Sequence, residues 1–170
     1  MSEEPKNLSV AMVLGIDLQP DQPAMAQTRY AGAAFRLASE HAGSSDYQAW
    51  YVLSLGMGLL FPTQFTHVDD RSLDGMLHGL STEDWTRDVT RSLAHGAGLA
   101  WWTGWGNTVD LDLFGPPGPI PDRLISALHR ELTDYPIMSR TTVAAPTLGL
   151  DAKAQREWFM AEAARRRGDQ

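Results

Sequence analysis

The sequence predicts a single α+β domain over residues 1–170, in which a small, mostly antiparallel sheet is packed by about five helices. A length of 170 residues suits one hydrophobic core. Apolar residues alternate with a period of two in some segments and recur every three to four residues in others, which indicates both strands and helices. The sequence contains no internal repeat, and residues 1–7 and 166–170 are expected to be flexible ends.

The first elements are predicted to be a strand and a helix. Between Leu8 and Leu18 every even position carries a large apolar side chain, which is the pattern of a strand. The motif "QPDQP" interrupts this pattern. The segment 24–41 then reads as a helix with a stripe of small and aromatic residues, and Gly43 lies beyond its end.

The segment 47–61 is apolar on nearly all sides. Two interpretations are open: a buried helix, or strands interrupted by Gly56 and Gly58. We favour the helix, with Asp46 as its cap.

The later elements begin with recognisable caps. Ser81 and Asp84 resemble a capping box ahead of a helix. Residues 122–134 form a second helix with an apolar line of leucines, preceded by a proline-rich connector. The motif "RTTVAAPTL" predicts a short edge strand, and Asp151 begins a C-terminal helix that ends in arginines.

The motif "LAWWTGWGNTVDLDLF", residues 99–114, predicts a β-hairpin with a turn at Gly106-Asn107. Side chains alternate across a strand, so Trp102 faces the core with the aliphatic residues at 109, 111 and 113. The other face combines aromatic rings with carboxylates. Its candidate partner-binding residues are Trp101, Trp105, Asp110 and Asp112.

Two indoles left in water would forgo about 1.5–3 kcal/mol each, so we expect something to cover this face. The first candidate is the C-terminal helix with Trp158 and Phe159. The second is a partner protein, because aromatic anchors inside a polar rim concentrate interface energy. The third is a small cation held by ring faces and carboxylates.

Composition excludes several classes of function. A net charge of -7 argues against nucleic acid and anionic membranes as partners. The absence of cysteine excludes disulfides, a thiolate nucleophile and cysteine-bound zinc. The N-terminus has acidic residues where a signal peptide needs positive charge, so we expect a cytoplasmic protein.

A metal-dependent enzyme is the alternative reading. The pattern His67-x-Asp69 with a later His129 and Arg140 resembles the iron- and 2-oxoglutarate-dependent oxygenases. That resemblance implies Fe2+ or another divalent metal on His67, Asp69 and His129, with Arg140 binding the carboxylate of the cosubstrate. The residues 122–134 around His129 are helical by periodicity, whereas the resemblance requires a barrel strand there.

The segment "IPDRLISALHRELTDYPIM", residues 120–138, resembles uncharacterised small proteins of actinobacteria and of their phages and plasmids. The resemblance covers roughly a tenth of the chain and carries no catalytic residues. It favours an accessory protein of a mobile element.

Together these features predict a non-enzymatic factor that binds another protein, of the inhibitor, immunity, chaperone or virion-assembly type, with no cofactor. The sequence does not identify this partner, and it leaves homo-oligomerisation open.

Overall fold

The structure is a computed structural model that describes residues 4–16, 22–44, 46–66 and 81–168. Its strands are β1 (Asn7–Gly15), β2 (Ala24–Met25), β3 (Ala49–Ser54), β4 (Gly58–Leu60), β5 (Phe65–Thr66), β6 (Thr108–Phe114) and β7 (Thr141–Ala144). Its α-helices are α1 (Ala26–Arg29), α2 (Ala33–Gly43), α4 (Thr82–Arg91), α5 (Leu99–Gly104), α6 (Pro119–Asp134) and α7 (Ala152–Gly168). A π-helical turn, η1 (Ser92–Gly96), continues α4, and a 3-10 turn, η2 (Pro136–Met138), follows α6.

The chain combines helices and strands as predicted, but its main sheet is mostly parallel rather than mostly antiparallel, and the described residues form six α-helices rather than about five. The strand order is β4-β3-β1-β6-β7, and β3, β1, β6 and β7 all run in the same direction. Helices return the chain between successive parallel strands, so a tight hairpin is not needed to connect them. Antiparallel pairing within the described residues is limited to β3 with β4 and to the small sheet of β2 with β5.

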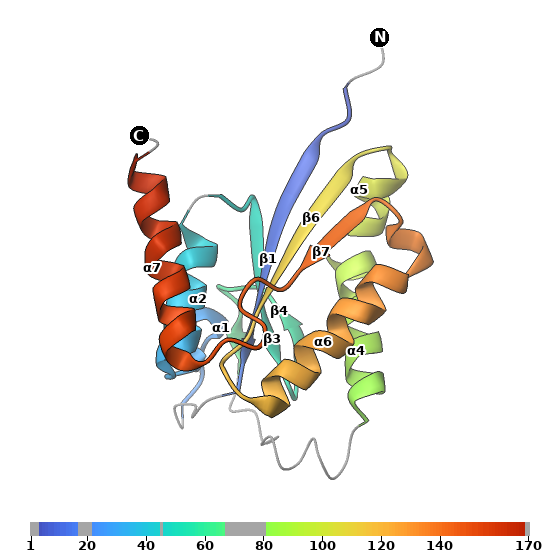
Figure 1. Ribbon diagram of the computed structural model, residues 1–170. Coiled ribbons are helices and arrows are strands. Elements are labelled where there is room, and N and C mark those ends of the chain that lie inside the picture. The colour runs from blue at the N-terminus through green and yellow to red at the C-terminus, as the bar shows by residue number, and fades with distance from the viewer. Residues whose placement is uncertain (1–3, 17–21, 45, 67–80, 169–170) are drawn as a thin grey trace.

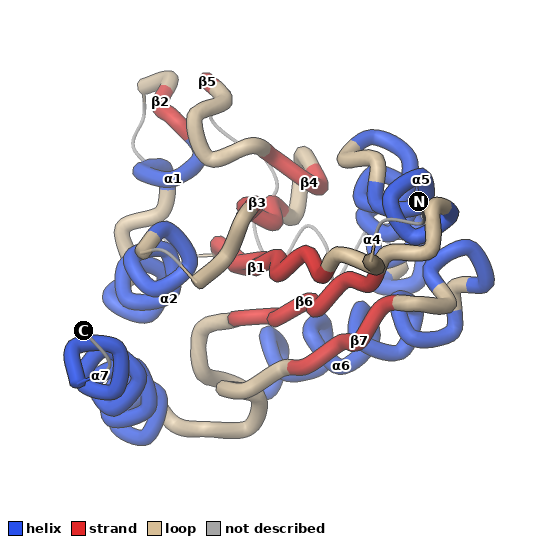
Figure 2. The backbone as a smooth tube through the Cα atoms, turned by 90° about the horizontal axis from the view of Figure 1, so that it is seen from above, coloured by secondary structure: helices blue, strands red, loops and turns tan. Residues whose placement is uncertain are grey.

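Helices cover both faces of this sheet, so the protein has three layers (Figures 1 and 2). One face packs on α4, α5 and α6, and its buried cluster includes Leu111, Leu113 and Leu128. The other face packs on α1, α2 and α7, with a cluster that includes Phe35 and Phe159.

The predicted first strand, with its alternating large apolar residues, is confirmed as β1. The alternation did not indicate that the other face of this strand is buried as well. All residues of β1 from Val10 to Leu14 are fully buried, including Ala11 and Val13 between the large apolar residues. Both faces of the strand are covered by helices, so its small residues are as buried as its large ones. Gly15 ends the strand, and a Cβ there would lie 2.2 Å from a ring carbon of Tyr30.

One helix prediction is right only in its second half, and another is wrong. The segment 24–41 divides into β2, α1 and α2, because the chain is extended at Tyr30 between the two helices. The segment 47–61 forms the hairpin of β3 and β4, with Gly58 in the left-handed region at φ 72°. Its apolar character on all sides reflects a strand buried on both faces rather than a helix.

The remaining elements follow the sequence closely. The hydroxyl of Ser81 accepts a hydrogen bond from the amide of Asp84, 3.1 Å away, and so begins α4. Asp151 does the same for the amide of Ala154 at 2.8 Å and begins α7. The helix α6 and the edge strand β7 lie where they were predicted.

Among the described residues, no helix has the length and apolar character that a membrane span requires.

Candidate functional site

The predicted hairpin at residues 99–114 is half wrong. The predicted second strand is present as β6, but the segment predicted as the first strand forms the helix α5. This helix begins after Gly98, whose backbone is in the left-handed region at φ 77°. In a helix, residues four apart share a face, so Trp101 and Trp105 lie together. Their ring centroids are 4.0 Å apart.

Consequently, the four candidate partner-binding residues do not form one surface. The helix α5 packs through Leu99 on the sheet face that also buries Val109. Asp110 and Asp112 alternate with these aliphatic residues along β6 and therefore point to the opposite face.

Trp101 and Trp105 remain in water. Their exposed fractions are 63% and 66%, whereas Trp102 between them is half-buried and donates its indole N–H to the carbonyl of Thr108. The C-terminal helix was expected to cover them, but α7 packs on α2 at the other face of the sheet. We call Trp101 and Trp105 the tryptophan patch.

The side chain of Arg140 and the backbone of Lys6 contact the turn that follows the tryptophan patch. Arg140 donates from Nη1 to the carbonyl of Gly106, 2.6 Å away, directly after Trp105. The backbone amide of Lys6 donates to the side chain of Asn107 at 2.9 Å. The guanidinium of Arg140 therefore brings a positive charge next to Trp105, although the chain as a whole has a charge of -7.

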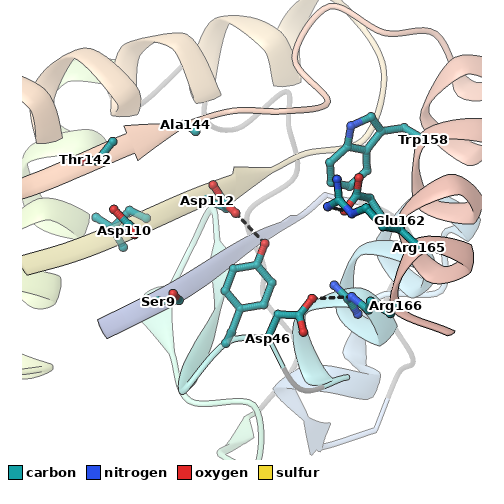
Figure 3. Close-up of a pocket in the computed structure, with 12 residues that line it drawn as sticks. Ser9, Asp46, Asp110, Asp112, Thr142, Ala144, Trp158, Glu162, Arg165 and Arg166 are labelled. Atoms are coloured by element: carbon teal, nitrogen blue, oxygen red, sulfur yellow. Dashed lines mark hydrogen bonds and ion pairs between the residues drawn. The ribbon is translucent and has the colours of Figure 1, made fainter. Parts of the chain in front are cut away.

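On the opposite face lies a pocket of about 560 Å³, over Asp110–Asp112 of β6 and Thr142–Ala144 of β7 (Figure 3). We call it the β6 pocket. Its lining consists of Ser9, Asp46, Tyr47, Asp110, Leu111, Asp112, Thr142, Ala144, Trp158, Glu162, Arg165 and Arg166. The last four of these side chains come from α7, which overhangs the strands.

The floor of the β6 pocket is a polar surface of the sheet. Ser9, Asp110 and Thr142 are neighbours in register across β1, β6 and β7. Asp112 lies two residues further along β6 beside Ala144. The part of α2 and α7 that packs on the sheet covers the opposite ends of these strands, where Phe114 and Val13 are buried.

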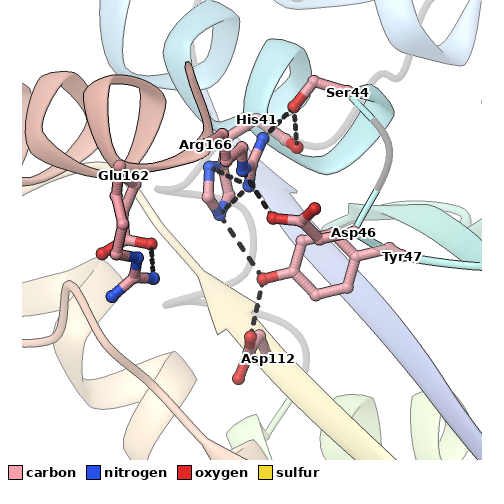
Figure 4. Close-up of polar contacts among 8 residues, drawn as sticks. His41, Ser44, Asp46, Tyr47, Asp112, Glu162 and Arg166 are labelled. Atoms are coloured by element: carbon pink, nitrogen blue, oxygen red, sulfur yellow. Dashed lines mark hydrogen bonds and ion pairs between the residues drawn. The ribbon is translucent and has the colours of Figure 1, made fainter. Parts of the chain in front are cut away.

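A chain of hydrogen bonds runs from α7 to β6 along one wall of this pocket (Figure 4). Arg166 lies 2.8 Å from Nδ1 of His41, Nε2 of His41 lies 3.4 Å from the hydroxyl of Tyr47, and that hydroxyl lies 2.6 Å from Oδ2 of Asp112. Nη2 of Arg166 lies 2.8 Å from Nδ1 and 3.2 Å from Nε2 of His41. We assign Nδ1 as the acceptor from Arg166 because that contact is the shorter one, which leaves the ring proton on Nε2 to donate to Tyr47.

Burial and charge keep this chain in one protonation state. Burial, and then the positive charge of Arg166, lower the pKa of His41 to about 4. Burial and the hydrogen bond to Asp112 raise the pKa of Tyr47 above its usual range. At neutral pH the imidazole is therefore neutral and the phenol is a donor.

The pKa of Asp112 is raised, first by burial and then by the nearby charges of Asp110 and Glu162, against the opposing effect of the hydrogen bond from Tyr47.

Aromatic rings surround the His41 end of this series of hydrogen bonds. His41 has edge contacts with Phe114, Trp158 and Phe159, with centroid distances of 5.3–5.4 Å.

The alternative metal site is only partly within the described residues. His67 and Asp69 lie outside them. His129 places Nε2 3.1 Å from the carbonyl of Val143, so this nitrogen donates to the edge strand β7. Arg140 is engaged with Gly106, as described above. Within the ranges that the structure describes, no three His, Cys, Asp or Glu side chains are grouped as metal ligands.

Sequence reasoning found Asp110 and Asp112 but missed the residues that surround them. Tyr47, His41 and Arg166 come from segments far from β6 in the sequence, and no spacing pattern connects them. The only available signal was the alternation along β6, which places both aspartates on one face.

Comparisons with family models, with curated proteins and with solved structures gave no match to this chain.

Proposed function

We propose that this protein acts by binding another protein through the tryptophan patch, and not by catalysis. The single observation that supports this proposal most is the exposure of Trp101 and Trp105, at 63% and 66%, the first within α5 and the second at its C-cap. Burying a large apolar side chain is worth about 1.5–3 kcal/mol. Leaving two indoles in water thus forgoes a substantial part of a net stability of about 5–15 kcal/mol.

The expected partner is a folded protein with an apolar groove bordered by carboxylates. Tryptophan is enriched among the residues that carry most binding energy, and such residues lie at the centre of an interface. The guanidinium of Arg140 lies beside Trp105, so an acidic group in the rim of the partner would complement it. A positive charge beside the indoles repels a basic partner. A second copy of this acidic chain is therefore a better match in charge than a basic protein is.

Nucleic acid is the competing ligand for exposed indoles beside basic residues, because bases stack on aromatic rings. The net charge of -7 opposes the approach of a phosphate backbone, so a protein partner is favoured.

We further propose that this factor works in the cytoplasm and that a phage or other mobile element of an actinobacterium encodes it. The resemblance of residues 120–138 supports this origin. So does the arginine-rich composition, in which Lys6 and Lys153 are the lysines among 14 basic residues.

Site-specific crosslinking tests the proposal. A photoreactive phenylalanine analogue replaces Trp101 or Trp105 in the full chain, and Met160 in a control. Met160 is 59% exposed and lies on α7, away from the patch. The variants are irradiated in a lysate of the source organism, and the crosslinked species is identified, purified and mixed with the wild-type chain.

The proposal expects one protein that crosslinks from positions 101 and 105 but not from 160, and that forms a stable complex after purification. Crosslinks to nucleic acid alone would contradict it. So would a partner captured equally from position 160, or no crosslink at either tryptophan.

A further inference from the structure

The β6 pocket contains an unbalanced set of charges. Four carboxylates line it, from Asp46, Asp110, Asp112 and Glu162, together with the two guanidinium groups of Arg165 and Arg166. The pocket therefore has more acidic than basic side chains. The ion pairs among these side chains determine which carboxylates can bind a ligand.

Both arginines are already paired within the protein. Arg165 forms an ion pair with Glu162, one turn away on α7. Arg166 lies 2.5 Å from Oδ2 of Asp46, and it also contacts Ser44 and His41. These two pairs account for all of the positive charge in the lining.

Asp110 and Asp112 have only neutral partners. The side-chain amide of Asn7 donates to Asp110 at 2.7 Å, and the hydroxyl of Tyr47 donates to Asp112 at 2.6 Å. Among the described residues neither aspartate forms an ion pair. A carboxylate can accept about four hydrogen bonds, so both aspartates retain acceptor capacity toward the pocket.

The spacing and the walls define which cation would fit. Asp110 and Asp112 are two residues apart on one strand, so their Cα atoms are separated by about 6.6 Å. An alkyl chain of four carbons separates two amino groups by a similar length. The indole of Trp158 and the ring of Tyr47 line the same pocket, and such rings attract ammonium groups and pack against methylenes.

We propose that the β6 pocket binds an aliphatic diamine or polyamine, with successive ammonium groups on Asp110 and Asp112 and the methylene chain beside Trp158. A volume of about 560 Å³ exceeds what a single metal ion needs and is in the range of small-molecule sites. This site lies on the opposite face of the sheet from the tryptophan patch, so its occupancy does not depend on the proposed protein partner.

Isothermal titration calorimetry of the full chain tests this site. The probes are 1,4-diaminobutane and spermidine, with n-butylamine as a monoamine and magnesium chloride as a simple dication. The variants are Asp110→Asn and Asp112→Asn, and the control is Asp88→Asn on the exposed face of α4. Circular dichroism and the melting temperature confirm that each variant is folded.

We expect 1,4-diaminobutane to bind saturably with one molecule per chain, and n-butylamine to bind about tenfold or more weakly, because it loses one charge-assisted hydrogen bond. Asp110→Asn and Asp112→Asn should each weaken diamine binding by about tenfold or more, while Asp88→Asn leaves it unchanged. Absence of saturable heat with either polyamine would overturn the proposal. Equal affinity for the monoamine, equal affinity for Mg2+, or full binding by a folded aspartate variant would also overturn it.

Discussion

The hydroxyl of Tyr47 donates to Oδ2 of Asp112 across 2.6 Å, although the two residues are 65 positions apart in the sequence. The bond joins the segment before β3 to β6, and β1 lies between these two strands in the sheet. The same hydroxyl is close to His41, so one phenol connects α2, β3 and β6 at the edge of the β6 pocket.

Tyr47→Phe should therefore destabilise the protein. The substitution leaves the half-buried Asp112 without its donor, and a lost hydrogen bond to a charged group costs about 1–3 kcal/mol. We expect a decrease of about 1–2 kcal/mol in the free energy of unfolding, measured by urea denaturation. Tyr135→Phe is the matched control, because the described residues contain no hydrogen bond to its hydroxyl and it should change stability little. Equal effects of the two substitutions would contradict the role of Tyr47.

Asp112→Asn should instead stabilise the protein at neutral pH. The raised pKa means that the folded state holds the charged form less favourably than the unfolded state does, so stability is lost as the pH rises through that pKa. Asparagine removes the charge and still accepts from Tyr47. Because Asp112 is only half-buried, we expect a gain of no more than about 1 kcal/mol at pH 7, shrinking as the pH is lowered. A loss of stability at pH 7 would show that the carboxylate is favourable there.

His41 should make the protein sensitive to mild acid. Its pKa is about 4 in the folded protein and about 6.5 when unfolded, so between these values the unfolded chain takes up a proton that the folded chain does not. Its contribution favours folding above pH 6.5 and is lost as the pH falls toward 4. Melting temperatures at intervals from pH 7 to pH 4 should decrease more steeply for the wild type than for His41→Asn. Parallel curves would rule out His41 as the responsible group.

Gly15→Ala should disrupt the packing at the end of β1. A Cβ at this position would lie 2.2–2.5 Å from three ring carbons of Tyr30, which is buried. Overpacking of this kind costs about 1–3 kcal/mol, and chemical denaturation measures it. Gly96→Ala is the control, because a Cβ at Gly96 meets no heavy atom within 4 Å, and it should be neutral. An unchanged midpoint for Gly15→Ala would mean that the ring moves aside at no cost.

The spacing of apolar residues correctly predicted the elements in which that spacing follows a single strand or helix period. The alternation in β1 and β6 and the capped starts of α4 and α7 are all visible in the sequence, because one face or one end of each element dictates the residue type. The segment 47–61 was misassigned because β3 is buried on both faces and carries no alternation. Strand direction was also wrong, since local patterns do not report which strands pair.

Local sequence patterns also predicted only part of the two candidate surfaces. The indoles at 101 and 105 are compatible with a strand or with one face of a helix, and Gly98 in a left-handed conformation decides for the helix. Both aspartates of the β6 pocket follow from alternation in β6. Their hydrogen-bond partners, Tyr47 ahead of β3 and Asn7 on β1, are 65 and 103 positions away, and no sequence pattern specifies these pairings.

The most direct test of the proposed function is the affinity of the purified chain for the partner that crosslinking identifies. Each interface tryptophan of this kind contributes about 2 kcal/mol, so Trp101→Ala with Trp105→Ala should raise the Kd by nearly a thousandfold, or about 4 kcal/mol. Met160→Ala, with a similarly exposed apolar side chain on α7, should leave the Kd unchanged. A folded double variant that binds the partner as tightly as the wild type would contradict the account.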